Sequence, residues 1–364
     1  MKKISLFIFG LGGGGAENVC VTLANGLADR GFNIDLVVLL LGNNGVRAKE
    51  LSDKVRLVAL KETRVRFSMF YIWRYLITAK PDVVLCFNNI LAVFIGIIRC
   101  LFFMKFKLIS RNINYTSIIE KRYFNYSLKG AISTIVVKCF YKLSDIFVAQ
   151  CNAMKKDLAE YFKIDPRKIV VINNPVNKVI ENYINTGFKS NISMNGYLLC
   201  VGRLEEQKAF HYAIEAFSRI SKDYPSLRLK LLGKGSLEVQ LRQLAEKLNI
   251  ANNIDFEGYK EDNISYYVNA RLTILTSIYE GFPNVLIESI ALGTPVVSFD
   301  CPSGPNEIIQ DGENGYLVNY EDMEHLTKCI RLSLDRKWNS EKIRVTAKRF
   351  SSEKIINEYA NILL

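Results

Sequence analysis

The sequence lacks closely spaced cysteines and contains only two histidines, His211 and His325. Its eight cysteines are scattered, and none forms a C-x-x-C pair. Structural zinc sites usually draw ligands from such pairs, so we expect no zinc site of that kind. Isolated cysteines in a large chain are typical of a reducing compartment, and we expect a cytoplasmic protein.

The sequence also lacks an apolar run long enough to cross a membrane. Its most apolar stretch, residues 90–106, is interrupted by Arg99 and Lys105, and the unbroken part is shorter than the roughly 20 residues that a spanning helix needs. Two interpretations stay open: a buried helix, or a helix lying on a membrane surface. The apolar residues 4–9 lead into glycines rather than a cleavage site, which favours a buried strand over a signal peptide.

Positive charge is concentrated in the first half of the chain. Residues 1–175 contain 26 Lys and Arg against 12 Asp and Glu, whereas residues 176–364 contain 22 against 24. This asymmetry indicates an anionic partner for the basic half alone, or an ordinary solvated basic face. Apolar and basic residues are interleaved around Trp73 and Arg74, which favours a lipid surface or a lipid-linked diphosphate over nucleic acid.

Short apolar segments alternate with amphipathic ones through most of the chain. The former predict buried parallel strands and the latter predict helices, a pattern typical of doubly wound α/β domains. A polar stretch rich in Asn and Ser at 173–196 interrupts the alternation. We therefore predict domains at 1–175 and 176–346, with a terminal helix at 347–364. The predicted strands are 4–9, 35–41, 83–87, 146–149, 168–172, 198–201, 227–232, 254–257, 273–276 and 295–299.

A glycine-rich loop, Gly10-Leu11-Gly12-Gly13-Gly14-Gly15, lies between the first predicted strand and helix. Glycine lets backbone N–H groups approach an anion, and a helix N-terminus favours negative charge. We therefore predict phosphate or substrate contact. The loop also matches G-x-G-x-x-G, so a dinucleotide enzyme stays open. Asp35, however, begins the second strand, whereas a ribose-binding acid would follow it.

Two cations follow the first predicted strand of the second half. Arg203 and Lys208 lie in a strand-to-helix loop, where doubly wound sheets bind ligands. Arg can bind a diphosphate through two hydrogen bonds, and Lys supplies a point charge. The simpler interpretation is a pair of surface cations beside Glu205 and Glu206. Gly233 opens a second glycine loop at the same sheet edge.

The segment 277–288 carries the strongest signal. A Gly-Phe-Pro turn follows a strand, and Asn284 is predicted to cap the next helix. Glu280 then lies in the loop and Glu288 about one turn into the helix. Carboxylates on both sides of a helix N-terminus suit a ligand that combines a phosphate with a polyol. Complementation of the helix dipole is the simpler interpretation.

Together these residues resemble glycosyltransferase family 4, whose members are retaining enzymes with the GT-B fold, in which two Rossmann-like doubly wound domains face a central cleft. The resemblance covers essentially the whole chain. Within the family, the sequence is similar to members that build bacterial surface polysaccharides or lipid-linked oligosaccharides. Its most specific part is the E-x7-E motif from Glu280 to Glu288. The other shared features are the glycine loop with Ala16-Glu17, Gly202-Arg203 with Lys208, and residues 293–297 and 300–308.

The resemblance implies an acceptor in the first domain and a nucleotide sugar, taken as a UDP-sugar, in the second. It also implies that the C-terminal helix at 347–364 crosses back to the first domain. Arg203 and Lys208 would neutralise the departing diphosphate. Glu280 would bind the sugar, and Glu288 the ribose hydroxyls. The other implied donor contacts are the backbone of Phe282, Pro283, Asn284 and Val285, the base contact at Gly258 and Tyr259, the loop at Gly233, and Gly14 and Gly15 of the first domain.

The chain departs from the family pattern in the first domain. Many members carry a histidine there, whereas both histidines of this chain lie in the second half. Arg111 or Asn112 stands in the corresponding region and is a candidate positioning residue. No D-x-D motif occurs, so we expect no metal and no cofactor, with fixed cations and helix amides stabilising the leaving group.

The predicted function is the retaining transfer of a hexose or N-acetylhexosamine from a UDP-sugar to a polyprenyl-diphosphate-linked glycan, in the synthesis of O-antigen, capsule or lipid-linked oligosaccharide. The predicted location is the cytoplasmic face of the cell membrane, contacted through the basic first domain, with no nucleic-acid partner. Two alternatives stay open. One is a dinucleotide-dependent oxidoreductase or epimerase that uses the loop 10–15, and the other is a non-catalytic glycan-binding homologue.

Overall fold

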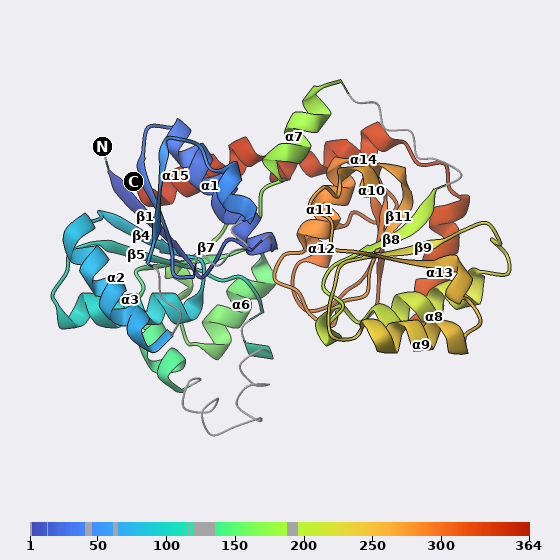
Figure 1. Ribbon diagram of the computed structural model, residues 1–364, viewed down its shortest axis with the longest axis horizontal. Helices are drawn as coiled ribbons and strands as arrows, with labels where there is room; N and C mark the ends of the chain where they lie inside the picture. Colours follow the sequence, from blue (N-terminus) through green and yellow to red (C-terminus); the bar gives the residue numbers. More distant parts are fainter. Residues whose placement is uncertain are drawn as a thin grey trace. The chain divides into compact units, whose positions relative to one another are not determined.

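The computed structural model describes residues 2–12, 14–40, 46–60, 65–115, 117–118, 135–187 and 196–364. The chain divides into two compact units (Figure 1). The first unit contains Met1–Pro175 and Ser352–Leu364, and the second contains Val176–Ser351.

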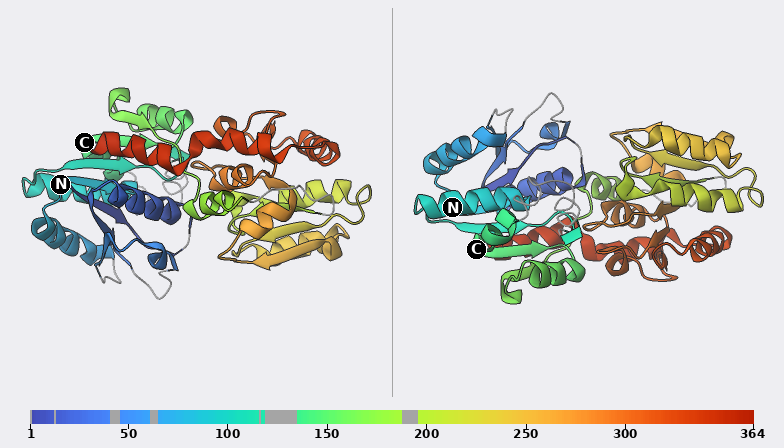
Figure 2. Two further views of the ribbon diagram at one scale, coloured as in Figure 1. Left: turned by 90° about the horizontal axis from the view of Figure 1, so that it is seen from above. Right: turned by 90° about the horizontal axis from the view of Figure 1, so that it is seen from below.

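Among the described residues, the first unit has a seven-stranded parallel sheet in the order β3-β2-β1-β4-β5-β6-β7. Helices α1 and α15 cover one face, and α2, α3 and α6 cover the other (Figures 1 and 2). The strands are β1 (Lys3–Ile8), β2 (Asn33–Val38), β3 (Val55–Ala59), β4 (Val83–Cys86), β5 (Lys107–Arg111), β6 (Ile146–Ala149) and β7 (Ile169–Val171). The helices are α1 (Gly15–Asp29), α2 (Val65–Ala79), α3 (Asn89–Leu101), α6 (Asn152–Tyr161) and α15 (Ser352–Leu363).

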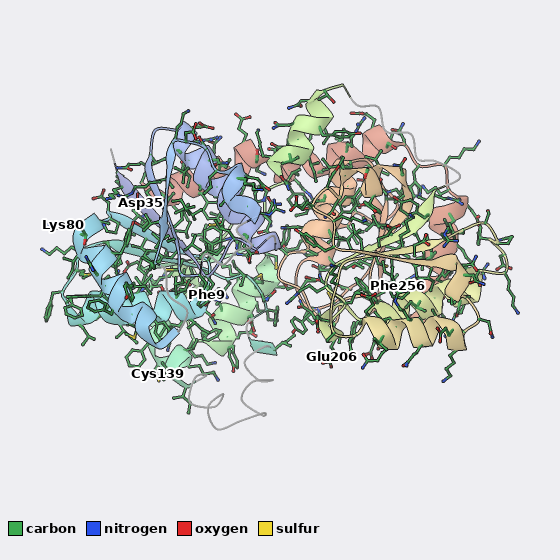
Figure 3. The ribbon with its side chains drawn as sticks, viewed as in Figure 1. Phe9, Asp35, Lys80, Cys139, Glu206 and Phe256 are labelled. Atoms are coloured by element: carbon green, nitrogen blue, oxygen red, sulfur yellow. The ribbon has the colours of Figure 1, made fainter. Side chains whose placement is uncertain are left out.

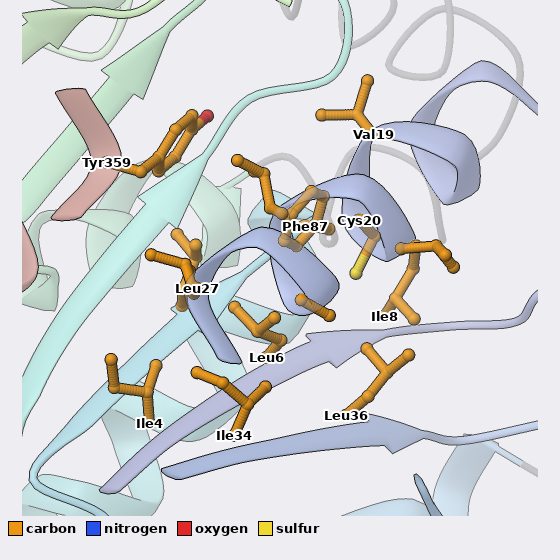
Figure 4. Close-up of a cluster of buried hydrophobic side chains, with 14 of the residues drawn as sticks. Ile4, Leu6, Ile8, Val19, Cys20, Leu27, Ile34, Leu36, Phe87 and Tyr359 are labelled. Carbon is orange, nitrogen blue, oxygen red and sulfur yellow. The ribbon is translucent and has the colours of Figure 1, made fainter. Parts of the chain in front are cut away.

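The C-terminal helix α15 belongs to the core of the first unit. Ile355, Ile356 and Tyr359 are buried in the same apolar cluster as β1 and α1 (Figure 4). A Cβ at Gly26 of α1 would lie 2.2 Å from Ile356 Cδ1, so glycine at this position lets α1 and α15 pack closely. The end of the chain therefore completes the core that the first 175 residues build.

Among the described residues, the second unit has a six-stranded parallel sheet in the order β10-β9-β8-β11-β12-β13. Its apolar core forms between the sheet and helices such as α8 and α13. The strands are β8 (Tyr197–Val201), β9 (Leu229–Leu232), β10 (Ile254–Gly258), β11 (Ala270–Leu275), β12 (Val296–Phe299) and β13 (Gly315–Val318). The helices are α7 (Lys178–Asn185), α8 (Phe210–Ile220), α9 (Glu238–Lys247), α10 (Ile264–Asn269), α11 (Asn284–Ala291), α12 (Pro305–Ile308), α13 (Met323–Asp335) and α14 (Ser340–Ala347).

The two sheets confirm the predicted fold class. Every predicted strand occurs within a few residues of its expected bounds, because buried parallel strands are continuous apolar runs. The sequence pattern does not predict β3, β5 and β13. Strand β5 lies inside the sheet, between β4 and β6, but charged residues at both of its ends, Lys107 and Arg111, leave an apolar run too short to stand out. Strands β3 and β13 are edge strands. An edge strand has one neighbour and carries more exposed side chains, so the apolar run that marks a central strand is weaker.

The apolar segment 90–106 forms α3 and the turn that follows it. The Asn88 side chain caps the helix by accepting from Ile90 N at 2.8 Å. Six of the 13 residues of the helix are buried, and its exposed large apolar residue, Leu101, lies at the C-terminal end. A search of the described ranges finds no helix long and apolar enough to span a bilayer.

Candidate functional site

The loops that carry the predicted donor residues leave one edge of the second unit's sheet. Strands β8 to β11 are neighbours in this parallel sheet, so their carboxyl ends lie together. Arg203 and Lys208 follow β8, Gly233 follows β9, Tyr259 follows β10, and Glu280 follows β11. The structure therefore gathers these predicted residues at one sheet edge.

Glycines allow the loops after β8 and β9 to pack against each other. Gly202 N donates to Leu232 O at 2.9 Å, and Gly233 N donates to Gly258 O at 2.8 Å. Gly233 has a φ of 149°, and a Cβ there would lie 1.8 Å from Gly202 O. A side chain at position 233 would therefore clash with the neighbouring backbone. Gly233 shapes the loop, and its contact with a donor stays a prediction.

Lys208 and Glu280 form an ion pair between the loops after β8 and β11. Lys208 Nζ lies 2.5 Å from Glu280 Oε1, and the Ser277 hydroxyl donates to the same oxygen at 2.6 Å. Glu280 is buried, and the Lys208 side chain is mostly buried. The carboxylate thus accepts hydrogen bonds from two side chains, which fix its position. Sequence analysis predicts Lys208 and Glu280 as separate ligand contacts and misses their pairing and Ser277.

Backbone contacts hold these two loops together. Lys208 ends a short 3-10 helix, and Ala209 follows with a φ of 44°. The Thr276 hydroxyl donates to Lys208 O and to Ala209 O, both at 3.1 Å. Ile278 N donates to Gln207 O at 2.8 Å. The position of Lys208 is therefore fixed by contacts between the loops after β8 and β11, in addition to its own short helix.

Arg203 is exposed at the beginning of the loop after β8. Its guanidinium lies 3.5 Å from Gln207 Oε1. Glu205, which the simpler interpretation pairs with Arg203, instead accepts from Ser236 N at 2.9 Å and from Ser236 Oγ at 2.7 Å. These hydrogen bonds lower the pKa of Glu205. The Arg203 side chain is thus exposed to solvent, five residues before Lys208 in the same loop.

The predicted cap at Asn284 is wrong. Helix α11 begins at Asn284 itself, and the N-cap residue is Pro283, which supplies no side-chain hydrogen bond. Pro283 has an extended backbone, with a φ of −71° and a ψ of 102°, and proline has no side-chain group that could cap the helix. Phe282 packs edge-on against Phe350 with ring centroids 5.7 Å apart. The positive end of the helix dipole lies at this turn and favours an anion. Val285, another predicted donor contact, is the second residue of the helix.

Glu288 lies in the second turn of α11 and has a partner that sequence analysis misses. The Tyr267 hydroxyl donates to Glu288 Oε2 at 3.0 Å. Tyr267 is fully buried on α10, and its backbone carbonyl accepts from Thr294 Oγ1 at 2.7 Å. Burial, together with the Glu288 carboxylate, raises the pKa of Tyr267 well above its usual value. Tyr267 is therefore a neutral donor that orients Glu288.

Gly258 ends β10, and Tyr259 begins the loop that follows. Gly258 has a φ of 71°, in the left-handed region that favours glycine. Tyr259, the next residue, is exposed. An exposed aromatic ring at a ligand-binding sheet edge could stack on a flat base. The predicted contact with a nucleobase stays a prediction.

Gly14 and Gly15 belong to the first unit, where they begin α1. Gly14 is the N-cap residue, and Gly15 is the first helical residue. Gly13 lies outside the described residues. A Cβ at Gly14 would lie 2.3 Å from Glu17 Oε2. Glycine at this position therefore leaves room for the Glu17 side chain over the helix start.

The structure gives Asp35 a role inside the first unit. Its carboxylate is buried in β2 and accepts from Arg56 Nε at 2.7 Å and from the Tyr75 hydroxyl at 2.6 Å. Lys3 Nζ lies 3.7 Å away. A dinucleotide enzyme would use an acid at the end of this strand to bind ribose, and Asp35 is instead committed to these three partners. The geometry therefore weakens the dinucleotide interpretation.

Arg111 is a fully buried cation at the end of β5. Its Nε donates to the Tyr359 hydroxyl at 3.0 Å, and its Nη2 donates to Asn174 Oδ1 at 2.5 Å. The guanidinium also lies 5.0 Å from the centroid of the Phe87 ring. These contacts join β5, α15 and the end of the first unit's first segment. Arg111 therefore holds the core of this unit together, and Asn112 accepts from the Tyr141 hydroxyl.

Within the residues described, no group of three His, Cys, Asp or Glu side chains is arranged to hold a metal ion. The sheet edge of the second unit offers an exposed Arg203, a Lys208–Glu280 pair, the start of α11 and the Glu288 carboxylate. Cations and a helix N-terminus can bind an anion such as a diphosphate, and carboxylates can accept hydrogen bonds from hydroxyl groups.

Family models match both halves of the chain. The model for glycosyl transferases group 1 matches residues 185–350, and the model for Glycosyltransferase Family 4 matches residues 13–178. An uncharacterized glycosyltransferase of Haemophilus influenzae is 29% identical over 371 residues, with all of both chains covered. An N-acetylgalactosaminyltransferase of Campylobacter jejuni, named for an acceptor linked to diphospho-undecaprenol, is 26% identical over 388 residues, again with both chains fully covered.

Solved structures of glycosyltransferases share the fold. HepE of Anabaena, solved in complex with UDP-glucose, aligns with a TM-score of 0.78 and 17% sequence identity. The alignment covers 100% of this chain and 99% of that one. The two parallel sheets thus form the GT-B fold that the sequence predicts.

The chain therefore belongs to the glycosyltransferases that the family 4 and group 1 models describe, one model for each half. It is an enzyme that transfers a sugar. It is similar to an amylovoran biosynthesis glycosyltransferase of Erwinia amylovora and, over about half of the chain, to a lipopolysaccharide core biosynthesis glycosyltransferase of Rhizobium meliloti.

Proposed function

We propose that this enzyme is a retaining hexosyltransferase that moves a hexose or N-acetylhexosamine from a UDP-sugar to a polyprenyl-diphosphate-linked glycan, in the synthesis of a surface polysaccharide or a lipid-linked oligosaccharide. The observation that carries the proposal is the Lys208–Glu280 pair at the carboxyl edge of the second sheet, with Arg203 exposed in the same loop.

The donor's groups find matching chemistry at this edge. Arg203 can bind the diphosphate through two hydrogen bonds, and Lys208 adds a second cation. The start of α11 favours the negative charge of the phosphate. Glu280, fixed by Lys208 and Ser277, accepts from hydroxyl groups of the sugar. Glu288, oriented by Tyr267, accepts from the ribose hydroxyls.

The reaction breaks the bond between the sugar's anomeric carbon and the diphosphate oxygen. A bond from the acceptor hydroxyl oxygen to the same carbon forms on the same face of the sugar, and the hydroxyl proton passes to the departing phosphate oxygen. Negative charge develops on the diphosphate as it leaves. Arg203, Lys208 and the helix dipole stabilise that charge, so the proposed reaction needs no metal ion and no cofactor.

The acceptor and the location follow from the charge distribution and from the relatives. The first half holds 26 Lys and Arg against 12 Asp and Glu, which favours an anionic acceptor or surface. A relative covered over its whole length carries the name of a transferase for a diphospho-undecaprenol-linked glycan. We therefore place this enzyme at the inner face of the cell membrane, with the lipid-linked acceptor bound by the first unit.

Two measurements test the proposal. A thermal-shift screen of nucleotide sugars identifies the donor, because a ligand that binds the folded state raises the unfolding temperature. A transfer assay with the identified donor and lipid-linked acceptors then measures product and its anomeric configuration. Arg203→Ala is expected to abolish transfer while the protein stays folded. Wild-type turnover in this variant, or an inverted product, contradicts the proposal.

A further inference from the structure

The first unit exposes a group of apolar side chains that the donor site does not use. Phe70 and Trp73 of α2 meet the C-terminal end of α3, where Leu101, Phe102 and Phe103 are exposed. The rings of Phe70 and Trp73 lie 5.7 Å apart between centroids, and those of Trp73 and Phe102 lie 5.3 Å apart. We call these five residues the aromatic patch. Figure 1 shows α2 and α3 side by side.

Phe103 has a backbone conformation that is unfavourable for phenylalanine, and its side chain is not buried. It follows the C-cap of α3 with a φ of 49°. Met104 N donates to Arg99 O at 3.0 Å, and Phe103 N donates to Cys100 O at 3.4 Å. This pattern normally places glycine in the left-handed position. Phenylalanine is strained there, and with 89% of its surface exposed it gains little from packing within its own unit.

The surroundings of the aromatic patch are positively charged. Residues 63–119 contain eight Lys and Arg and one acidic residue, Asp82. Two of these cations do not add to the surface charge, because Arg99 pairs with Asp145 and Arg111 is buried. The Asp82 carboxylate accepts from Lys3 N at 2.7 Å. Arg74, Lys80 and Lys105 are exposed next to the patch in sequence, and Figure 3 shows Lys80 at the end of α2. Exposed aromatic rings bordered by cations suit a surface that is apolar inside and anionic outside.

The location of the patch leaves the ligand-binding edge of the first sheet free. The end of α3 leads into the amino terminus of β5, whereas Gly14 and Gly15 follow the carboxyl end of β1. Because the strands are parallel, these two features belong to opposite edges of the sheet. The patch can therefore be covered without blocking the glycine loop.

We propose that the aromatic patch is a docking surface for an anionic phospholipid bilayer. The inference rests on the proposed use of a lipid-linked acceptor and names the part of the first unit that meets the lipid. Phe102 and Phe103 enter the interfacial region, Trp73 packs behind them, and the neighbouring cations contact lipid phosphates. A second copy of this chain is disfavoured as the occupant, because a symmetric contact would bring two positive surfaces together.

Vesicle binding tests the proposal with a matched pair of variants. Phe103→Asp is compared with Val239→Asp, which changes an exposed apolar residue of α9 in the second unit. Sedimentation with vesicles of phosphatidylglycerol and phosphatidylcholine is expected to show about tenfold weaker binding for Phe103→Asp and wild-type binding for Val239→Asp. Equal binding of wild type and Phe103→Asp overturns the proposal, and so does equal binding to pure phosphatidylcholine.

Phe103→Gly separates docking from folding. Glycine relieves the left-handed strain, so the unfolding temperature is expected to stay the same or rise while vesicle affinity falls about tenfold. Undiminished vesicle affinity in this variant overturns the proposal. Light scattering that shows a stable dimer of the wild type, lost in Phe103→Gly, also overturns it, in favour of a second copy as the occupant.

The chain contains two tryptophans, Trp73 and Trp338, so the Trp338→Phe variant reports on Trp73 alone. Brominated phospholipid in anionic vesicles is expected to quench its fluorescence, and absence of quenching overturns the proposal. Transfer to a short-chain, water-soluble acceptor analogue is expected to stay at the wild-type rate in Phe103→Gly. If the wild-type enzyme binds vesicles normally but transfers sugar to no acceptor, the result contradicts the proposed function and not the docking proposal.

Discussion

Lys208 and Glu280 form a buried ion pair between two loops of the second unit, with Nζ and Oε1 2.5 Å apart. The residues are 72 positions apart in sequence, and the Ser277 hydroxyl shares the same carboxylate oxygen. A buried carboxylate is stable only while it keeps its cation and its hydrogen bonds. The same two side chains are therefore expected to affect both donor binding and the free energy of unfolding of the second unit.

Removing the lysine is expected to cost both stability and activity. Lys208→Met leaves the Glu280 charge buried without its cation, which should lower the free energy of unfolding by at least about 3 kcal/mol. Transfer should fall about 10²- to 10³-fold, because a charge that stabilises the leaving group is lost. Denaturant titration and kcat/KM measure the two effects.

The double variant Lys208→Met/Glu280→Gln separates these effects. Neutralising both partners is expected to recover most of the lost stability and none of the lost activity. Lys222→Met, which changes an exposed lysine, serves as the control with wild-type values of both. A Lys208→Met protein as stable as the wild type would show that the pair contributes nothing.

Tyr267 is expected to act on donor binding through Glu288. Tyr267→Phe removes the hydroxyl that donates to Glu288 Oε2, at a cost of about 1 kcal/mol in unfolding free energy. The KM for the UDP-sugar should rise about tenfold with little change in kcat, since the ribose contact is made before and during the reaction. The preference for the ribose donor over its 2′-deoxy analogue should shrink.

Tyr266→Phe is the matched control on the same helix, because its hydroxyl donates to Glu257 at 3.0 Å. It should leave the discrimination between ribose and deoxyribose donors unchanged. If both variants discriminate like the wild type, Tyr267 has no positioning role.

The Asp35 network predicts a pH dependence for the first unit. Burial by itself raises the pKa of Asp35, but the hydrogen bonds from Arg56 and Tyr75 and the nearby cations lower the pKa below its usual value overall. The ionised form is therefore favoured in the folded state. Its stabilisation is complete above an unfolded-state pKa of about 3.9 and is lost as the pH falls through the lower folded-state value.

Asp35→Asn should flatten the acid limb of the stability curve, measured by thermal unfolding between about pH 5 and pH 2. Asp53→Asn, at an exposed carboxylate, should leave that limb as in the wild type. An unchanged acid limb in Asp35→Asn would show that this carboxylate is not preferentially ionised in the folded state.

Transfer is expected to survive removal of divalent metals. The proposed site stabilises the leaving diphosphate with Arg203, Lys208 and the start of α11, which supply the charge that a metal would otherwise supply. The assay compares enzyme treated with EDTA and then desalted with untreated enzyme. Activity that is lost and then restored only by Mn²⁺ or Mg²⁺ would contradict the metal-free mechanism.

Local sequence is sufficient for most of the central strands and for the loops that carry the site. Central parallel strands are short apolar runs, and glycines, prolines and charged residues mark the loops that follow them. The segments around Arg203 and Glu280 are recognisable for this reason. The predicted capping role of Asn284 is wrong because α11 begins at Asn284 itself, which leaves the N-cap position to Pro283.

The sequence by itself determined the alternation of strands and helices, the family and the residue types that face a donor. Only the tertiary structure decided which of these residues meet. Lys208 with Glu280 and Tyr267 with Glu288 are joined across 72 and 21 positions, and Phe103 is left exposed in a strained turn. These outcomes depend on which strands become neighbours and which helices pack together, because contacts between distant segments have no periodic signature along the chain.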